Sequence, residues 1–310
     1  MIGIADIAAY IPAGSESNFD KKDDFEIDDA FIRDKLGIER VSRKGADEET
    51  SDLCVRAFLA LQQRSPVDIG VVDCLVVCTQ NPDGFGIPHT SAVVHGKLAA
   101  RDACAAFDIG LGCSGYVYAL SVVSAFMAAN GLKNGLLFTA DPYSKIIDAA
   151  DKNTVLLFGD GATVTLLQEV GAGARWLPRR FLFATRGAQG EAINNRSGRL
   201  QMNGRAVFNF SATLVPEQIR ALLAAEDLPL AAVDRFLLHQ GSKFIVDTLT
   251  ARLGLAPEKV PIRLAQHGNT ISSSIPLLLQ DLLADTRLGT LVLCGFGVGL
   301  SWASAILRRV

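Results

Sequence analysis

The chain has 310 residues, of which 49% are hydrophobic and 20% are charged, so it can bury a large core and is not a disordered chain. Its 30 lysines and arginines against 33 aspartates and glutamates give a net charge of −3, which disfavours a dedicated nucleic-acid-binding function. No apolar run is long enough to span a membrane, and the N-terminal stretch MIGIADIAAYIPAG is typical of a buried strand and turn rather than a signal peptide.

Short apolar runs alternate with helical stretches along the chain, which indicates an α/β protein. After the N-terminal strand, we predict strands at 74–79, 105–108, 135–139, 155–158, 163–167, 235–238 and 290–294. We predict helices at 51–63, 115–129, 211–225, 243–253 and 272–283. The acidic segment 15–29 is expected to be a solvated loop, and the polar, glycine-rich segment 185–199 a loop or lid between two halves.

The two halves of the chain repeat one order of elements. VDCLVVCTQ at 72–80 is similar to VDRFLLHQG at 233–241, and small residues after a glycine begin a helix in both GCSGYVYALSVV and GNTISSSIPLLL. A further strand and a glycine-bearing turn follow in each half. These matches predict a duplicated α/β unit with halves at 1–170 and 171–310, although generic βαβ units could match by coincidence.

The six cysteines are scattered, which is typical of the reducing cytosol and predicts a cytoplasmic location. Cys74 and Cys78 lack the second pair that a zinc site needs, so we expect no metal. Cys113 stands between a predicted strand and a predicted helix, flanked by Gly112 and Gly115. Because a helix N-terminus favours thiolate over thiol, Cys113 is a candidate nucleophile; the alternative is a buried structural cysteine.

Two polar residues could act with this sulfur. His239 ends an apolar strand before a Gly-Ser turn, where it would either face a cleft or be a hydrogen-bonded core histidine. Asn269 could cap the helix predicted at 272–283. If a pseudo-twofold axis relates the halves, Asn269 and Cys113 are equivalent and point into one cleft. The three residues would then form a thiol nucleophile with two hydrogen-bond donors.

Two glycine-rich turns do not fit nucleotide binding. GFGVG at 295–299 lacks the lysine and hydroxyl residue of a phosphate-binding loop, and GDGAT at 159–163 is too short for a dinucleotide site. Exposed N–H groups of the 295–299 turn could instead face a developing oxyanion.

Together these motifs resemble the beta-ketoacyl-ACP synthase III family of condensing enzymes. The similar stretches, collinear over nearly the whole chain, are FDIGLGCSGYVYAL, LLHQGSKF, QHGNTISSSIP, FGDGAT and GFGVGLSWASAIL. The resemblance implies a thiolase-like, five-layered αβαβα fold, a homodimer, and acyl transfer from acyl-CoA toward an acyl carrier protein. It implies no bound cofactor, because CoA and phosphopantetheine arrive as thioester substrates.

The resemblance also implies a role for each matching position. Cys113 would be the acylated nucleophile, and His239 and Asn269 would act on a malonyl-ACP that loses CO2 and condenses with the acyl group. The oxyanion hole would combine the N–H of Cys113 with one from the 295–299 turn, at Gly297 or Gly299. The substrate-binding positions would be Phe31, Lys35, Ile87, Lys152, Arg205, Phe208, Ser242 and Lys243.

Several of these positions depart from the family pattern. Phe31 and Lys35 replace a tryptophan and an arginine at the CoA adenine site, and Lys152 replaces a second CoA-binding arginine. Arg205 replaces an asparagine of the pantetheine channel, Val298 replaces a glycine, and the family's HQAN reads HQGS. These changes leave open a non-elongating acyltransferase acting on a hydroxyl or amine, or a non-catalytic scaffold. A hydroxymethylglutaryl-CoA synthase would need a carboxylate base, for which there is no convincing match.

The implied partners add two expectations. An acidic carrier protein needs a local basic patch on this net-negative chain, and the segments 33–44 and 243–263 are the candidates. The dimer would join through the strand at 105–108 and would bring Ile87 to the partner's acyl pocket.

Overall fold

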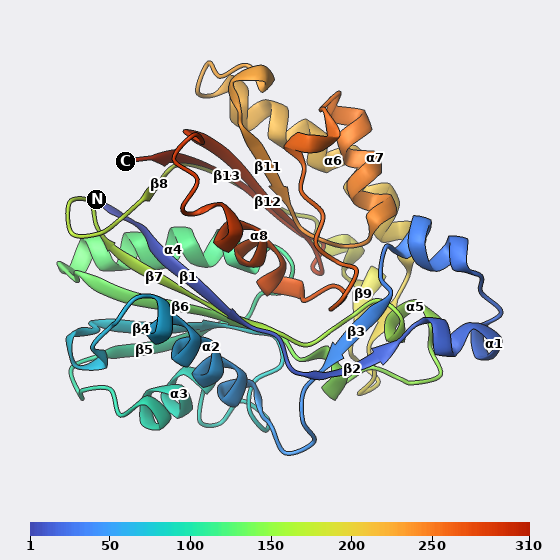
Figure 1. The fold of residues 1–310 in the computed structure, drawn as a ribbon, viewed down its shortest axis with the longest axis horizontal. Coiled ribbons are helices and arrows are strands. Elements are labelled where there is room, and N and C mark those ends of the chain that lie inside the picture. Colours follow the sequence, from blue (N-terminus) through green and yellow to red (C-terminus); the bar gives the residue numbers. More distant parts are fainter.

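The computed structural model describes all 310 residues and contains a nine-stranded sheet. Its strands are β1 (Ile2–Tyr10), β4 (Cys74–Cys78), β5 (Ala105–Ile109), β6 (Asn134–Ala140), β7 (Ala162–Glu169), β8 (Trp176–Thr185), β11 (Arg235–Leu238), β12 (Thr290–Gly297) and β13 (Ser301–Arg309). Across the sheet they lie in the order β11-β12-β13-β8-β1-β7-β6-β4-β5 (Figure 1). Two short ribbons pair β2 (Gly14–Ser17) with β3 (Arg40–Arg43) and β9 (Ile193–Asn194) with β10 (Gln201–Met202).

This sheet consists of two half-sheets that meet at β1 and β8. The only ladder pair between these two strands is Ile4 with Trp176, whereas β1 pairs with β7 along its length. The run β4-β6-β7-β1 matches β11-β12-β13-β8, because each has one parallel pairing followed by two antiparallel ones. The predicted duplication is therefore confirmed, and only β5 lacks a counterpart in the second half.

Helices cover both outer faces of the half-sheets and fill the space between them. Helices α2 (Thr50–Arg64) and α3 (Thr90–Leu98) cover the first half-sheet, and α6 (Gly204–Ala224), with α7 (Lys243–Leu253) beside it, covers the second. Between the half-sheets lie α4 (Gly115–Asn130) and α8 (Ser274–Leu282). No residue of α4 is charged, as expected for a helix packed between two sheets. The five layers form the predicted αβαβα arrangement.

The apolar core follows these layers. A cluster of 26 buried residues joins the two half-sheets through α4 and α8, and a cluster of 18 lies under α2. The largest cluster, of 29 residues, lies on the α6 side of the second half-sheet and includes Cys113. The nucleophile candidate is thus part of a packed apolar region. None of the helices combines the length and the apolar run that a bilayer crossing requires.

Two expectations about local structure are wrong. The segment 155–158 is not a strand, because the Asp151 side chain accepts the Asn153 N–H and starts a short helix, α5 (Lys152–Val155). The acidic segment 15–29 is not only a solvated loop, since it contains β2 and a short helix, α1 (Lys22–Phe25). Within it, Glu16 forms ion pairs with Lys21 and Arg43, which hold the segment against β3.

Candidate active site

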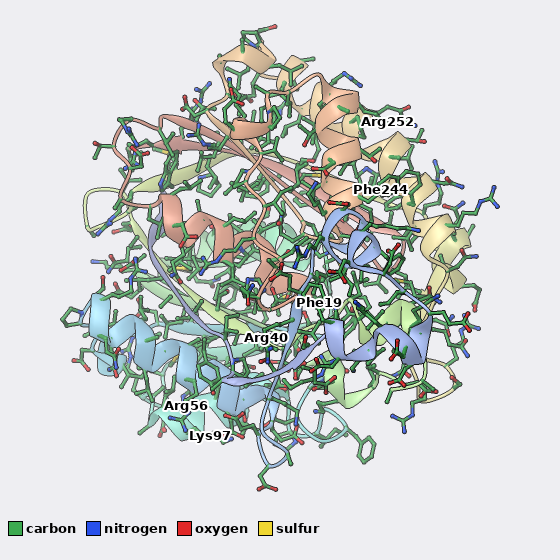
Figure 2. The ribbon with its side chains drawn as sticks, turned by 45° about the vertical axis from the view of Figure 1, so that its right-hand side comes forward. Phe19, Arg40, Arg56, Lys97, Phe244 and Arg252 are labelled. Atoms are coloured by element: carbon green, nitrogen blue, oxygen red, sulfur yellow. The ribbon has the colours of Figure 1, made fainter.

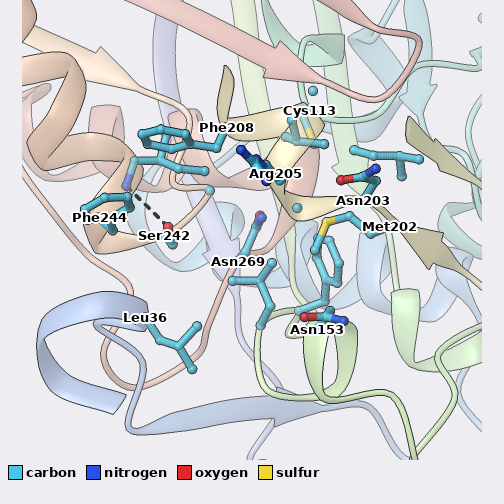
Figure 3. A pocket seen from close by; sticks show the side chains of 18 of the residues that line it. Leu36, Cys113, Asn153, Met202, Asn203, Arg205, Phe208, Ser242, Phe244 and Asn269 are labelled. Atoms are coloured by element: carbon cyan, nitrogen blue, oxygen red, sulfur yellow. Dashed lines mark hydrogen bonds between the residues drawn. The ribbon is translucent and has the colours of Figure 1, made fainter. Parts of the chain in front are cut away.

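A cavity of about 660 Å³ is lined by residues from both halves of the chain. Its buried end contains Cys113, His239 and Asn269, which are 6%, 2% and 2% exposed. Its outer end is lined by exposed side chains, among them Lys35 and Phe244. The cavity therefore leads from the surface to the three residues that the sequence predicted to share a cleft (Figure 3).

The outer end of this cavity is suited to an anionic ligand with an apolar part. Lys35, Lys152 and Arg205 all line it and are exposed, whereas no aspartate or glutamate lines it. The rings of Phe208 and Phe244 stack there with their centroids 5.1 Å apart. A phosphate-bearing chain is a ligand that matches three cations beside stacked aromatic rings.

Cys113 lies at the N-terminal end of α4, one residue before the N-cap residue Ser114. Glycines at the end of strand β12 allow its backbone to approach Cys113 closely. A Cβ on Gly297 would lie 2.7 Å from both Cβ and Sγ of Cys113, and a Cβ on Gly295 would lie 2.6 Å from the Cys113 carbonyl oxygen. Only glycine fits such separations, so the C-terminal turn is packed directly against the nucleophile candidate.

Burial raises the pKa of the Cys113 thiol to about 12. The backbone N–H groups of Val298 and of Cys113 itself lower this pKa, but by less than burial raises it. Burial therefore opposes the thiolate that the helix N-terminus was expected to favour. At neutral pH the group is a thiol that must lose its proton as it reacts.

His239 follows β11 directly, and its N–H donates to the carbonyl of Cys294 on β12 at 2.8 Å. Its ring packs edge-on against Phe296, with the ring centroids 5.4 Å apart. Burial lowers the pKa of His239 to about 3, so the imidazole is neutral and has one N–H and one lone pair.

The proton on His239 is positioned by Ser274, at the start of α8. Ser274 Oγ lies 2.7 Å from His239 Nδ1 and 3.0 Å from the carbonyl oxygen of Ile271. The hydroxyl has one proton and can donate it to only one of these two acceptors. When it donates to Nδ1, the imidazole proton is on Nε2 and is available as a donor.

Asn269 is held by its backbone and by one end of its amide. It forms a bridge with Phe158, and its N–H donates to the Leu157 carbonyl at 2.9 Å. Asn269 Oδ1 accepts the N–H of Ile271 at 2.9 Å, so the amide nitrogen is the end left free to donate. Asn269 does not cap α8, as the sequence suggested, because a tight turn at 271–273 separates the two.

Ile271 links the two polar residues and is itself strained. Its N–H binds Asn269, its carbonyl accepts from Ser274, and its φ of 52° is in the left-handed region that a β-branched residue rarely adopts. Such a conformation costs on the order of 1–3 kcal/mol and occurs mainly where the surrounding structure imposes it. The turn at Ile271 thus orients the donors of both Asn269 and His239.

One backbone N–H of the 295–299 turn acts on the sulfur. It is the N–H of Val298, and not that of Gly297 or Gly299, that lowers the pKa of the Cys113 thiol, so Val298 joins the candidates for the oxyanion hole. Gly297 lines the cavity but serves as the close-contact position, and Gly299 does not line it. The donor pair beside the sulfur is therefore the N–H of Cys113 and that of Val298.

The predicted substrate-binding residues divide into two groups. Phe31, Lys35, Lys152, Arg205, Phe208 and Ser242 line the cavity. Ile87 and Lys243 do not. Ser242 also caps α7, where its hydroxyl accepts the Ile245 N–H at 3.3 Å. Lys243 pairs with Asp247 at 2.5 Å.

Sequence reasoning missed several residues that line the cavity, and of those around a second one it singled out only Val298. In the main cavity these include Leu36, Asn153, Met202, Asn203, Val207 and Phe244. The second cavity, of about 160 Å³, is lined by Gln80, Asn81, Tyr143, Ile146, Ile193, Asn194, Asn195, Leu200 and Val298. Ile193 lines both cavities. The stretch CTQNPDG, directly after a buried strand, was the available signal for Gln80 and Asn81.

Comparison with known proteins gives a consistent result along the chain. Residues 107–181 match the family described as 3-oxoacyl-[acyl-carrier-protein] synthase III, and residues 223–309 match the description of its C-terminal part. The beta-ketoacyl-[acyl-carrier-protein] synthase III of Streptococcus mutans is 32% identical, and the alignment covers 98% of both chains. The protein of that name from Rhodospirillum rubrum is 34% identical with the same coverage.

Solved structures show the same similarity. The beta-ketoacyl-[acyl-carrier-protein] synthase III structure from Thermus thermophilus superposes with a TM-score of 0.90 at 31% identity, covering 99% of this chain and 98% of that one. A 3-oxoacyl-(acyl-carrier protein) synthase from Burkholderia xenovorans gives a TM-score of 0.89 at 31% identity, covering 100% and 94%. The priming β-ketosynthase of the R1128 polyketide pathway, at 24% identity and a TM-score of 0.89, shares the fold.

Proposed function

Because this chain belongs to the 3-oxoacyl-[acyl-carrier-protein] synthase III family of condensing enzymes, we propose that its substrates are an acyl-CoA and a malonylated acyl carrier protein. The observation that carries the proposal is the cavity that joins Cys113, His239 and Asn269 to three surface cations without any carboxylate. CoA is a phosphorylated chain that ends in a thioester, which suits both ends of this cavity. The carrier protein in the relatives' names supports the second substrate. The reaction as proposed needs no resident cofactor, because both substrates supply their own pantetheine.

In the first step, Cys113 Sγ attacks the thioester carbonyl of the acyl-CoA. The sulfur loses its proton, the tetrahedral oxyanion is stabilised by the N–H groups of Cys113 and Val298, and collapse expels CoA, which leaves as the free thiol. The two N–H groups and the N-terminal end of α4 favour the anionic forms that the buried site otherwise disfavours. The product is an S-acyl cysteine, with the acyl group on the far side of the sulfur from CoA.

In the second step, malonyl-ACP enters the same cavity and loses CO2. Negative charge grows on its thioester oxygen, where His239 Nε2–H and the Asn269 amide nitrogen donate. This role requires that Ser274 donates to Nδ1 of His239. The enolate carbon then attacks the acyl-Cys113 carbonyl, a carbon–carbon bond forms, and the Cys113 sulfur leaves and takes up a proton. A 3-oxoacyl group remains on the carrier.

A homodimer is part of the proposal, and the unpartnered edge of β5 supports it. This strand ends the nine-stranded sheet, and the loop before α3 exposes Phe85 and Ile87 almost fully, at 104% and 93%. Val122 on α4 and Phe183 on β8 are each 45% exposed. An apolar sheet edge of this kind is usually covered by a partner. Light scattering should give twice the chain mass of 33.1 kDa, and a monomer at micromolar concentration would contradict the dimer.

The function is tested by following both half-reactions on one protein. Intact-protein mass spectrometry after mixing with straight-chain acyl-CoAs should show one acyl adduct, which Cys113→Ser abolishes. Addition of radiolabelled malonyl-ACP should then release CO2 and return the enzyme to its unmodified mass. An adduct that forms but never decarboxylates any malonyl thioester would show transfer without condensation. No adduct at any chain length would contradict the proposal.

A further inference from the structure

Building on the proposed function, we infer that the starter acyl group is short, uncharged and carries its own oxygen atom. The second cavity, lined by Gln80, Asn81 and Tyr143, would hold this group and hydrogen-bond its oxygen. The basis for the inference is the position of the cavity, the state of its amide groups, and its size.

The second cavity lies directly beside the reacting sulfur. Val298 lines the second cavity and directly follows Gly297, where a Cβ would lie 2.7 Å from Cys113 Sγ. A Cβ on Gly112, the residue before Cys113, would lie 2.3 Å from Gln80 Oε1 and 2.9 Å from Val298 Cγ1. Two lining residues of the second cavity are therefore in contact with the turn that carries the nucleophile. CoA and the carrier arm occupy the main cavity, so the second cavity is the space left for the acyl group.

Two amides in this cavity have donors that no protein atom satisfies. Asn81 is 6% exposed, and its amide nitrogen is buried without a hydrogen-bond partner. Gln80 is half-buried, and its Oε1 accepts the Tyr143 hydroxyl at 3.0 Å, so its amide nitrogen is the free end; of the two donors, the fully buried one is that of Asn81. A buried donor without a partner is destabilising, and its retention is explained when a ligand supplies the acceptor.

The backbone of Asn81 is held without help from its side chain. The Asn81 N–H donates to Thr79 Oγ1 at 3.0 Å, and the Asn81 carbonyl accepts the hydroxyl of Thr50. The neighbouring Gln80 N–H donates to Asp141 at 2.7 Å. The amide of Asn81 is thus not needed to shape the loop, which leaves it free for a ligand.

The size and charge of the cavity limit the acyl group further. About 160 Å³ holds roughly five non-hydrogen groups, at about 30 Å³ each. The side chain of Val298 forms part of its wall, where glycine would leave the space open. No lysine, arginine, aspartate or glutamate lines the cavity, so a second carboxylate on the acyl group would be buried without a counter-charge. These limits fit an acyl chain with about four non-hydrogen atoms beyond the thioester carbonyl, one of them oxygen.

The test compares two acyl groups of the same shape. In 3-hydroxybutyryl-CoA a hydroxyl stands where isovaleryl-CoA has a methyl group, so the pair differs only in hydrogen bonding. We expect the rate of Cys113 acylation, as kcat/KM by intact mass, to be about tenfold or more higher for one enantiomer of 3-hydroxybutyryl-CoA than for isovaleryl-CoA. Equal rates, or a faster reaction with isovaleryl-CoA, would overturn the inference and leave the proposed function intact. Absence of any adduct, including with acetyl-CoA, would instead contradict the proposed function.

Two variants assign the preference to Asn81. Asn81→Leu keeps the size of the side chain and removes the amide, and it should abolish or reverse the preference while retaining acylation by isovaleryl-CoA. The control is Asn130→Leu, at the exposed C-terminal end of α4 and outside both cavities, where the amide faces water and the preference should persist. A hydroxyacyl preference unchanged in Asn81→Leu would overturn the role of Asn81. If that variant does not fold, the wild-type comparison alone still decides whether the acyl group carries oxygen.

Discussion

Replacing Gly297 by alanine should disable acylation while leaving the fold in place. The added Cβ would lie 2.7 Å from both Cβ and Sγ of Cys113. Ordinary contacts of such atoms are about 3.5–4.0 Å, so the sulfur or the end of β12 must move by about 1 Å. A misplacement of that size at a reacting atom costs on the order of 10²-fold in rate. Overpacking of the site should also lower the free energy of unfolding by about 1–3 kcal/mol.

The matched control for Gly297→Ala is Gly96→Ala. Gly96 lies inside α3, and a Cβ there would meet no atom within 4 Å. Alanine should therefore stabilise α3 by about 0.5–1 kcal/mol and leave catalysis unchanged. The assay is the rate of acyl-adduct formation by intact mass, with urea denaturation for stability. If Gly297→Ala acylated at the wild-type rate with unchanged stability, the close packing of the turn against Cys113 would be refuted.

Three further predictions concern chemistry at the site and its rim. His239→Ala and Asn269→Ala should each still form the acyl-enzyme but release CO2 about 10²–10³-fold more slowly. The rate loss in the double variant should be smaller than the product of the two single losses, because both donors serve one oxygen. An equal loss in the rate of acylation would count against these roles. Because burial raises the pKa of Cys113 to about 12, its alkylation by iodoacetamide should accelerate about tenfold per pH unit from pH 7 to 10, and a plateau near pH 8 would show a thiolate at rest. Lys243→Glu, beside the cavity mouth, should raise the Michaelis constant for the carrier protein without changing acylation by acyl-CoA. Arg56→Glu, on α2 over the first half-sheet (Figure 2), is the control outside both candidate patches. Equal effects of Lys243→Glu on both steps would contradict docking of the carrier at Lys243.

The positions of the three central residues could be predicted because each depends on local sequence and topology. Cys113 and Asn269 stand just before the matched central helices of two duplicated halves, with the 271–273 turn between Asn269 and α8, and His239 directly follows a strand of the second half. Elements that repeat in order must also repeat in space, so residues at the same point of each repeat meet at the pseudo-twofold axis. Residue type and spacing were sufficient for this part of the site.

Other features depend on backbone direction and burial, which residue types do not specify. The N–H of Val298, rather than that of a neighbouring glycine, meets the sulfur because of the course of the turn, and no side-chain pattern reveals the direction of an amide. The thiol pKa of Cys113 depends on how completely the whole fold removes the sulfur from water. The contact between Ser274 and His239 joins residues 35 positions apart and follows from how α8 packs on β11. The same holds for the second cavity, whose walls come from four separate segments.

Few backbone hydrogen bonds join the two half-sheets, so side-chain packing determines the angle between them. With one ladder pair between β1 and β8, backbone hydrogen bonds do little to resist a rotation of one half against the other. The apolar residues of α4 and α8 resist it instead, and these two helices also lead into Cys113 and Asn269. Replacing a fully buried residue such as Leu120 or Leu279, neither of which lines a cavity, by alanine should therefore allow the halves to turn and change the separation of nucleophile and donor. In directed evolution of this scaffold, substitutions in its middle layer would tune catalytic geometry from a distance, whereas substitutions under α2, which lines neither cavity, would affect mainly stability.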